Sequence, residues 1–315
     1  MDRRAFMQTT ALLATGATLP GFLGATARAA RASRDERILV VLQLTGGNDG
    51  LNTVIPYEDD LYHKSRPTLR VDPSRALKLG QGLGLHPNMV ELKALYDEGL
   101  VNVINNVGYP NPDRSHFRSM DIWHTGRLRP EDVEEGWLGR VIDGTPPGGS
   151  PTALHLDDSA LPLALRASSR PVPSIRDIDA FRLRHHDEAL DRALRTPRQG
   201  DDLMYVQRLA IESCANARRI ESVHASNEGD WPDHDLGRRL RQIADLISSD
   251  FGPRVYYTSI GGFDTHARQA MTHPRLVAEV SSGLGAFMRA MQARGLSDRV
   301  LVMTFSEFGR RVKEN

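Results

Sequence analysis

The eight residues RILVVLQL (37–44) strongly limit how this chain can fold. The stretch is apolar almost throughout, instead of alternating between apolar and polar residues. Such a continuous run is typical of a strand that is covered on both of its faces. In globular proteins, strands of this kind belong to parallel sheets with helices packed on either side. We therefore expect an α/β fold.

The remainder of the chain alternates between strand and helix patterns, as an α/β fold requires. Further strands are expected at 100–108, 254–260 and 298–305, and helices at 86–99, 136–143, 201–222 and 234–250. A long amphipathic helix follows, carrying Leu276, Val280, Leu284, Phe287 and Met291. The segment from about 150 to 200 shows only weak patterning, and we expect it to form an irregular excursion over the surface of a single domain spanning 31–315.

Charge and cysteine content argue against two classes of function. The chain has 40 basic and 40 acidic side chains, so it lacks the basic excess that binding to nucleic acid requires. Cys214 is the single cysteine, which excludes an intramolecular disulfide and a cysteine-based metal site. Helical spacing places Cys214 on the apolar side of the 201–222 segment, where it is expected to be part of the core.

The first thirty residues resemble an export signal. Arg3-Arg4 precede a short, weakly apolar stretch, and Ala27-Arg28-Ala29 has the form of a cleavage site. The paired arginines resemble a twin-arginine signal, so we expect the twin-arginine machinery to export the folded protein to the periplasm or beyond. The alternative is a disordered basic tail. No other stretch approaches 18 continuous apolar residues, so no stable membrane span is expected in the mature form.

Four loops that follow the expected strands hold most of the chemically suggestive residues. In an open parallel sheet, functional groups gather where the strands release their carboxyl ends. If all four strands run the same way, these loops are neighbours in space. They carry Asn48 and Asp49; Ser115 and His116; Asp264 and His266; and Ser306, Glu307 and Arg310.

These residue types suit metal-assisted hydrolysis of a small anionic ester. Asp49, Asp264 and His266 are ligands that Zn²⁺, Mg²⁺ or Mn²⁺ accept. Residues two apart in an extended segment point the same way, so Asp264 and His266 can reach one ion. Ser115 precedes a helical stretch whose first turn stabilises anions, and a serine beside a metal can attack phosphorus or sulfur.

Each of these features also has a purely structural interpretation. The sequence Gly-Gly-Asn-Asp-Gly (46–50) is often a turn, and Ser115 is a suitable helix N-cap. His116 can be a packed surface histidine, Asp264 with His266 a polar turn, and Glu307 with Arg310 an ion pair at a helix start. The coincidence of four such loops after four strands is what favours the metal site.

Six segments together resemble the DUF1501 family of exported bacterial proteins: LTGGNDGLNTVIPY, GLHPNMVELKALYDEG, GYPNPDRSHFRSMDIWHTG, GWLGR, GGFDTHARQ and RVLVMTFSEFGRR. The resemblance runs from about residue 37 to the end and is weakest between 150 and 230. The family is grouped with the alkaline phosphatase/sulfatase superfamily. The resemblance therefore implies a three-layer α/β/α sandwich with a mostly parallel central sheet. It also implies one or two divalent ions (Zn, Mg, Mn or Ca) at the carboxyl ends of the strands, with no established substrate.

The resemblance also implies roles for individual residues. Asp49 matches the first metal-binding aspartate, and Asp264 with His266 matches the pair that holds one metal. Ser115 takes the place of the nucleophile, with His116 beside it. Two further residues, Glu307 and Arg310, fall in the Ser-Glu-Phe-Gly-Arg segment of the family. We count Glu307 among the metal ligands, and Arg310 with Ser115 and His116 among the catalytic residues.

An Asp-His pair normally follows this segment in the family, within a Gly-Thr-Asp-His-Gly stretch, and the present sequence ends at Asn315 before it. The resemblance thus implies a fold that is incomplete at the C-terminus. We expect an exported metal-dependent hydrolase of phosphate or sulfate esters. The alternative is a non-catalytic exported binding or scaffolding module with a vestigial or structural metal site. A metal-free serine hydrolase using Ser115 is disfavoured, because the chain lacks a Gly-x-Ser-x-Gly elbow.

Overall fold

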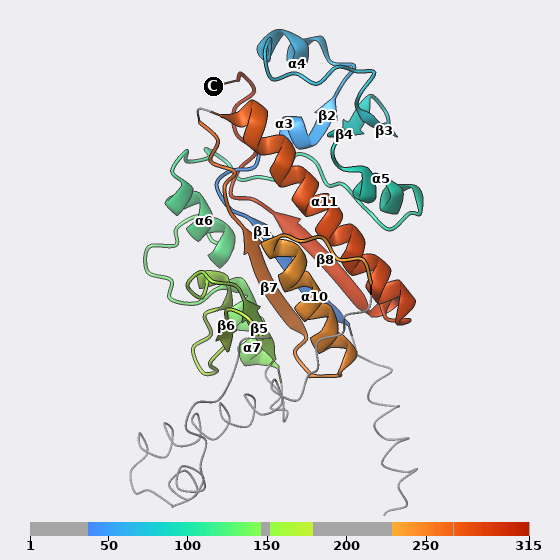
Figure 1. Ribbon diagram of the computed structural model, residues 1–315. Helices are drawn as coiled ribbons and strands as arrows, with labels where there is room; N and C mark the ends of the chain where they lie inside the picture. The colour runs from blue at the N-terminus through green and yellow to red at the C-terminus, as the bar shows by residue number, and fades with distance from the viewer. Residues whose placement is uncertain (1–36, 146–151, 179–228, 267, 315) are drawn as a thin grey trace, which may run out of the picture. The chain divides into compact units, whose positions relative to one another are not determined.

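A five-stranded sheet lies at the centre of the fold, in the spatial order β6-β5-β7-β1-β8 (Figure 1). All of its neighbouring strands pair in parallel. The computed structural model describes residues 37–145, 152–178, 229–266 and 268–314. The strands are β1 (Ile38–Leu44), β5 (Ala153–Leu156), β6 (Ser174–Ile175), β7 (Val255–Ile260) and β8 (Val300–Phe305). The predicted α/β fold with a mostly parallel central sheet is thus confirmed.

Helices cover both faces of this sheet. One face packs against α5 (Val90–Asp97), α10 (Asp235–Ser248) and α11 (Gln269–Ala293), of which α10 and α11 run side by side in Figure 1. The other face packs against α7 (Trp137–Gly144) and the short 3-10 helix η1 (Leu163–Leu165). Side chains of β1 alternate between the two apolar cores: Val40 and Leu42 belong to the first, and Val41 to the second. This double burial explains the uninterrupted apolar run in the sequence.

A smaller antiparallel sheet adjoins these layers, in the order β2-β4-β3. It has an apolar cluster of its own, made by Ile55, Tyr57, Tyr62 and Ala76. The sequence analysis did not predict this sheet, because its strands are only three or four residues long. The remaining elements are α3 (Gly50–Thr53), β2 (Val54–Pro56), α4 (Asp60–Ser65), β3 (Leu77–Gly80), β4 (Leu83–Leu85), α6 (His116–Thr125) and η2 (Ser297–Arg299).

The strand expected at 100–108 does not form. Residues 100–115 adopt neither helix nor strand, and Leu100, Ile104 and Val107 are exposed to solvent. Asn106 has a φ of 59°, a left-handed conformation that interrupts extended backbone. The segment therefore adds no strand to the sheet, and the prediction of a strand there was wrong.

The expected irregular excursion at about 150–200 also needs correction. Residues 153–156 form the fully buried strand β5, and residues 174–175 form the edge strand β6. Both were missed because they are short and because His155 interrupts the apolar pattern of β5. Residues 146–151 and 179–200 lie outside the described residues. So do the expected helix at 201–222, with Cys214, and the N-terminal signal.

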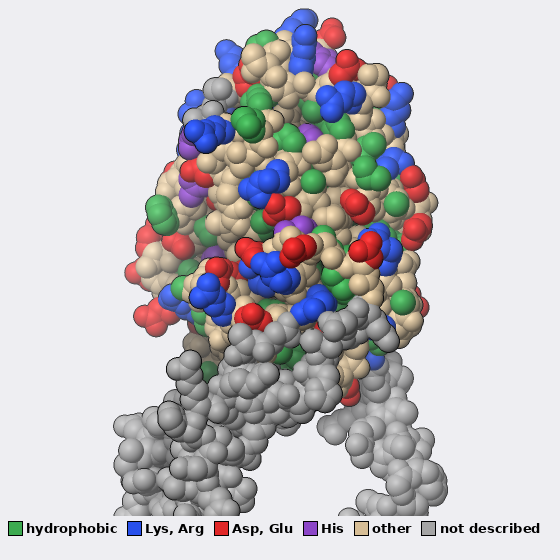
Figure 2. Space-filling view, viewed as in Figure 1, with side chains coloured by type: hydrophobic (Ala, Val, Ile, Leu, Met, Phe, Trp, Pro, Cys, Tyr) green, Lys and Arg blue, Asp and Glu red, His purple; other side chains and the backbone are tan. Residues whose placement is uncertain are grey.

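Surface charge is mixed on the face seen in Figure 2, where basic and acidic side chains are interspersed. This distribution agrees with the formal net charge of zero. Among the described residues, no helix is both long and apolar enough to cross a membrane.

Three buried histidines make the fold sensitive to acid. Burial lowers the pKa of His86, His124 and His273 to about 4 in each case, well below the value near 6.5 of an exposed imidazole. The folded protein therefore keeps these rings neutral in a pH range where the unfolded chain binds protons.

We expect the free energy of unfolding to fall as the pH drops from about 6.5 to about 4, and this loss to be absent above pH 6.5. In that window the unfolded state binds more protons, so stability rises with pH by at most about 1.4 kcal/mol per pH unit for each histidine. Urea denaturation at pH 7, 5.5 and 4.5 measures the effect. His124→Gln should reduce the slope, and a stability that is flat across the window would contradict the expectation.

Candidate metal centre

The carboxyl ends of three adjacent strands bring most of the predicted site residues together. Strand β1 leads into residues 45–49, β7 into residues 261–266, and β8 into residues 306–310. The fourth predicted contributor, His116, comes from the first turn of α6 and not from a strand end. The inference that parallel strands collect functional groups at one edge therefore holds for three of the four loops.

Three side chains at this edge could hold a metal ion: His116, Asp264 and His266. One donor atom from each lies within 4.8 Å of the others, and the described residues contain no second group of this kind. His266 Nε2 is 2.7 Å from Asp264 Oδ1, and His116 Nε2 is 3.5 Å from the same oxygen. The side chains are 32%, 47% and 67% exposed for His116, Asp264 and His266, so the group is open to solvent.

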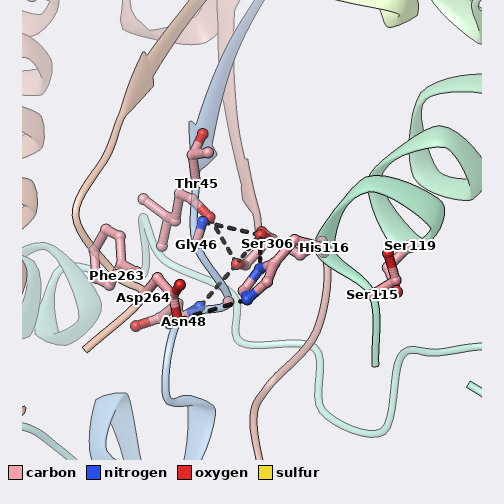
Figure 3. Close-up of polar contacts among 12 residues, drawn as sticks. Thr45, Gly46, Asn48, Ser115, His116, Ser119, Phe263, Asp264 and Ser306 are labelled. Carbon is pink, nitrogen blue, oxygen red and sulfur yellow. Dashed lines mark hydrogen bonds and ion pairs between the residues drawn. The ribbon is translucent and has the colours of Figure 1, made fainter. Parts of the chain in front are cut away.

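Glu307 lies behind His116 and fixes its orientation. The imidazole Nδ1 is 2.9 Å from Glu307 Oε1, and the carboxylate is buried. Gly46 N also donates to Glu307 Oε1 at 2.9 Å, and Ser306 Oγ lies 3.0 Å from Oε2. Figure 3 shows Gly46, Ser306 and His116 gathered around this position. In the tautomer that carries its proton on Nδ1, the ring donates to Glu307 Oε1 and presents the lone pair of Nε2 to the group, as in the carboxylate–histidine pairs behind many protein-bound metals.

This arrangement suits a cation between His116 and Asp264. With its proton on Nδ1, the ring offers Nε2 as an acceptor, and that atom faces a carboxylate oxygen 3.5 Å away. Two acceptors in this position can be bridged by a metal ion, by a second proton on the ring or by a water molecule that donates to both. Two ring nitrogens and one carboxylate oxygen are the donor set of an open zinc site.

Gly46 and Gly47 allow the loop after β1 to come into contact with its neighbours. Both have positive φ values, 112° and 72°, which side chains rarely tolerate. A Cβ at position 46 would lie 2.5 Å from the backbone nitrogen of Asp264. A Cβ at position 47 would lie 2.3 Å from the ring of Phe308, which itself packs against His116 with ring centroids 4.7 Å apart. The double glycine thus serves close packing between the site segments.

Arg310 borders the group on its other side. Its Nη2 donates to Asp264 Oδ1 at 2.7 Å, and its Nε donates to Gly47 O at 3.1 Å. The side chain is largely buried, and Nη1 makes no hydrogen bond to the described residues. The backbone of Arg310 has a φ of 62°, an uncommon conformation for a residue with a long side chain. Arg310 is therefore held in place while its Nη1 can still donate to a bound group.

Ser115 does not face this group. It is the N-cap of α6, and its Oγ accepts from Arg118 N at 3.4 Å. Figure 3 shows its side chain beside Ser119, away from His116 and Asp264. The structural interpretation of Ser115 as a helix cap thus describes its position, and the expected role as nucleophile has no geometric support.

Asp49 also lies outside the group. Its carboxylate is buried, with Oδ2 accepting from Arg66 Nη1 at 2.5 Å and also from Gln269 Nε2, while Oδ1 has no hydrogen-bond partner. Neither Arg66 nor Gln269 was singled out in the sequence. No motif marks Arg66, which follows the short helix α4 in a polar segment. Gln269 carries a weak signal, since it stands three residues after His266 in the GGFDTHARQ segment.

Glu307→Gln is expected to weaken zinc binding by about 10- to 100-fold, because the amide cannot accept the Nδ1 proton as strongly or fix the ring as firmly. The change is nearly isosteric, so unfolding by urea should shift little. Isothermal titration with Zn²⁺ provides the measurement, and Glu98→Gln, on the surface after α5, provides a matched control. An affinity equal to that of the control would mean that Glu307 does not support the group.

Comparison with known proteins gives one match. The family model described as "Protein of unknown function (DUF1501)" matches residues 102–315, which include every member of the candidate metal centre except the Gly46-Gly47 loop. Neither the curated proteins nor the solved structures contain a match to the chain.

Proposed function

Because the chain belongs to the DUF1501 family, whose function is unknown, we propose its activity from the candidate metal centre: metal-dependent hydrolysis of a phosphate or sulfate ester. The observation that carries the proposal is the group formed by His116, Asp264 and His266, with Glu307 behind it. Arg310 is the cationic partner beside it. Such a combination can hold a divalent cation and an anion next to one another.

Zinc fits this donor set best. Imidazole nitrogens and one carboxylate oxygen are common zinc ligands, and three protein ligands leave a coordination position open. Calcium and magnesium favour sites built from oxygen atoms alone, which this group does not offer. A divalent ion bound here would supply a Lewis acid and a water molecule that ionises near neutral pH.

Glu307 and Arg310 would then have different roles in the reaction. Glu307 keeps the Nδ1 proton of His116 in place, and Arg310 offers Nη1 to an oxygen of the transferred group, whose charge rises during the reaction. Neither nearby serine is placed to attack. Ser115 lies away from the group, and Ser306 Oγ is engaged with Leu44 O at 2.6 Å and with Asn48 N at 2.9 Å. We therefore propose water, and not serine, as the nucleophile.

The test is a metal titration followed by a turnover assay. The purified protein, stripped with a chelator, is titrated with Zn²⁺, Mg²⁺, Mn²⁺ and Ca²⁺, and each form is assayed on nitrophenyl phosphate and nitrophenyl sulfate. We expect about one zinc ion per chain and turnover that depends on it. A protein that binds none of the four ions would contradict the proposal.

A non-catalytic exported binding or scaffolding module is the second candidate. One observation favours it: Asp264 Oδ1 is already shared by Arg310 and His266, so the group can be stable as a network of ion pairs. Stoichiometric metal binding with no turnover over a broad panel of esters would support this module over the hydrolase.

We also propose the alkaline phosphatase/sulfatase superfamily as the wider relationship. Its support is the parallel sheet with polar side chains gathered at the carboxyl ends of three strands.

Export by the twin-arginine machinery to the periplasm or beyond is a separate proposal, which rests on residues 1–30 alone. Replacing Arg3 and Arg4 by lysine should leave the protein in the cytoplasm, as cell fractionation would show, and unchanged export would refute this route.

A further inference from the structure

Asp49 and Arg66 form an ion pair that is almost completely closed to solvent, with side chains 2% and 1% exposed. Taking two charges out of water is unfavourable, and a buried pair is often no more stabilising than apolar residues of similar size. Stability alone therefore does not account for this pair, and the other contacts of Arg66 indicate what it does.

Arg66 uses its remaining nitrogens to hold backbone carbonyls far along the chain. Its Nη2 donates to Arg311 O at 2.7 Å, and its Nε donates to Val312 O at 3.0 Å. These carbonyls belong to the two residues that directly follow Arg310. The guanidinium is thus a rigid fork with Asp49 on one side and the 310–314 segment on the other.

The far end of the 310–314 segment is attached to the same part of the chain. The Glu314 carboxylate accepts from Thr68 N and from Leu69 N, the latter at 2.7 Å, and also from Thr68 Oγ1 at 2.8 Å. Glu314 N donates to Ser65 O at 3.2 Å. Residues 65–69 therefore hold the segment at Arg311 and Val312 and again at Glu314.

We infer that Asp49 acts, through Arg66, as a positioning residue that sets Arg310 beside the candidate metal centre. Arg310 carries the strained φ of 62°, so its backbone needs support from the residues around it. The support lies one and two residues downstream, at the carbonyls that Arg66 holds. Arg310 then reaches back to Gly47 O and Asp264 Oδ1. The role of Arg310 in binding an anionic substrate rests on the proposed function. The placement of Arg310 by Asp49 and Arg66 does not depend on that function.

The positioning is tested first in the metal-free protein. The Nε–H of Arg310 donates to Gly47 O, so its exchange with solvent should be slow in ¹⁵N NMR spectra, with Arg310→Lys used to assign the signal. Glu314→Ala and Asp49→Asn should each speed this exchange by at least about fivefold. Asp60→Ala removes an exposed carboxylate from the neighbouring helix α4 and should change nothing. Exchange that is unaltered in both Glu314→Ala and Asp49→Asn would overturn the inference, and Glu314→Ala keeps the test valid if Asp49→Asn fails to fold.

A double-mutant cycle then tests the consequence for binding. In the zinc-loaded protein, Glu314→Ala should weaken the binding of inorganic phosphate several-fold, and this effect should vanish when Arg310 is already alanine. An equal effect in both backgrounds would mean that the segment acts independently of Arg310, and the inference would fail. If the wild type binds neither zinc nor phosphate, the proposed function fails, while the NMR experiment still decides the positioning.

Discussion

Replacing Asp264 by asparagine is expected to lower the affinity for zinc by about 100-fold or more and to abolish any metal-dependent turnover. Asp264 supplies the anionic donor of the group, and its Oδ1 contacts both histidines. An amide oxygen is a weaker ligand than a carboxylate. The loss of charge also leaves the Arg310 guanidinium without its partner, so that it repels an incoming cation. Supporting residues alone change metal affinity by about 10- to 100-fold, and a direct donor should matter at least as much.

The measurement is a zinc titration of the variant beside the wild type, with metal content checked after dialysis. Asp97→Asn is the matched control, because Asp97 is a surface carboxylate paired with Lys93 at the far end of α5. An Asp264→Asn protein that retains the affinity of the control would remove this residue from the metal centre, and with it the main support for the proposed hydrolase.

Arg66→Met is expected to reduce the free energy of unfolding by about 3–5 kcal/mol, the largest stability effect foreseen for a single replacement here. The change leaves the Asp49 carboxylate buried without its countercharge. It also removes the hydrogen bonds to Arg311 O and Val312 O. Urea denaturation at pH 7 measures the loss.

Two further variants separate the buried charge from the loss of packing. The double variant Asp49→Leu with Arg66→Met should recover a large part of the lost stability, because no unpaired charge then remains inside. Arg238→Met breaks exposed ion pairs with Asp233 and Asp235 and should change stability by less than about 1 kcal/mol. If Arg66→Met loses as little stability as Arg238→Met, the Asp49–Arg66 pair is not buried in solution.

Most of the fold could be predicted because the signals are local. The continuous apolar run of β1 and the helical spacing in α10 and α11 each lie within a short stretch of sequence. The wrong predictions concern stretches whose burial depends on packing against distant parts of the chain. Residues 100–108 look like a strand but remain exposed, whereas the four residues of β5 are fully buried between β6 and β7.

The composition of the site could be predicted more readily than the roles within it. The rule that parallel strands end at one edge brought Asp264, His266, Glu307 and Arg310 together correctly. Whether a carboxylate faces an ion or supports a histidine depends on ångström-scale geometry that no spacing in the sequence encodes. Glu307 was predicted to be a ligand, and in the structure its Oε1 contacts His116 Nδ1, outside the group of three possible donors. The Asp49–Arg66 pair illustrates the same limit, since the partner of a buried charge is set by tertiary packing.

The order of strands in the central sheet has a consequence for the stage of folding at which the proposed ion could bind. The contacts that build the site join distant parts of the chain: Gly46 and Glu307 are 261 residues apart, and His116 and Glu307 are 191 apart. Parallel pairing over such separations closes long loops and is slow compared with helix formation. Strand β8 pairs with β1 and delivers Glu307 and Arg310 together, so His116 has no support until β8 has docked. A nascent chain would therefore have little affinity for zinc at this edge of the sheet, and metal loading would be a late event that follows folding.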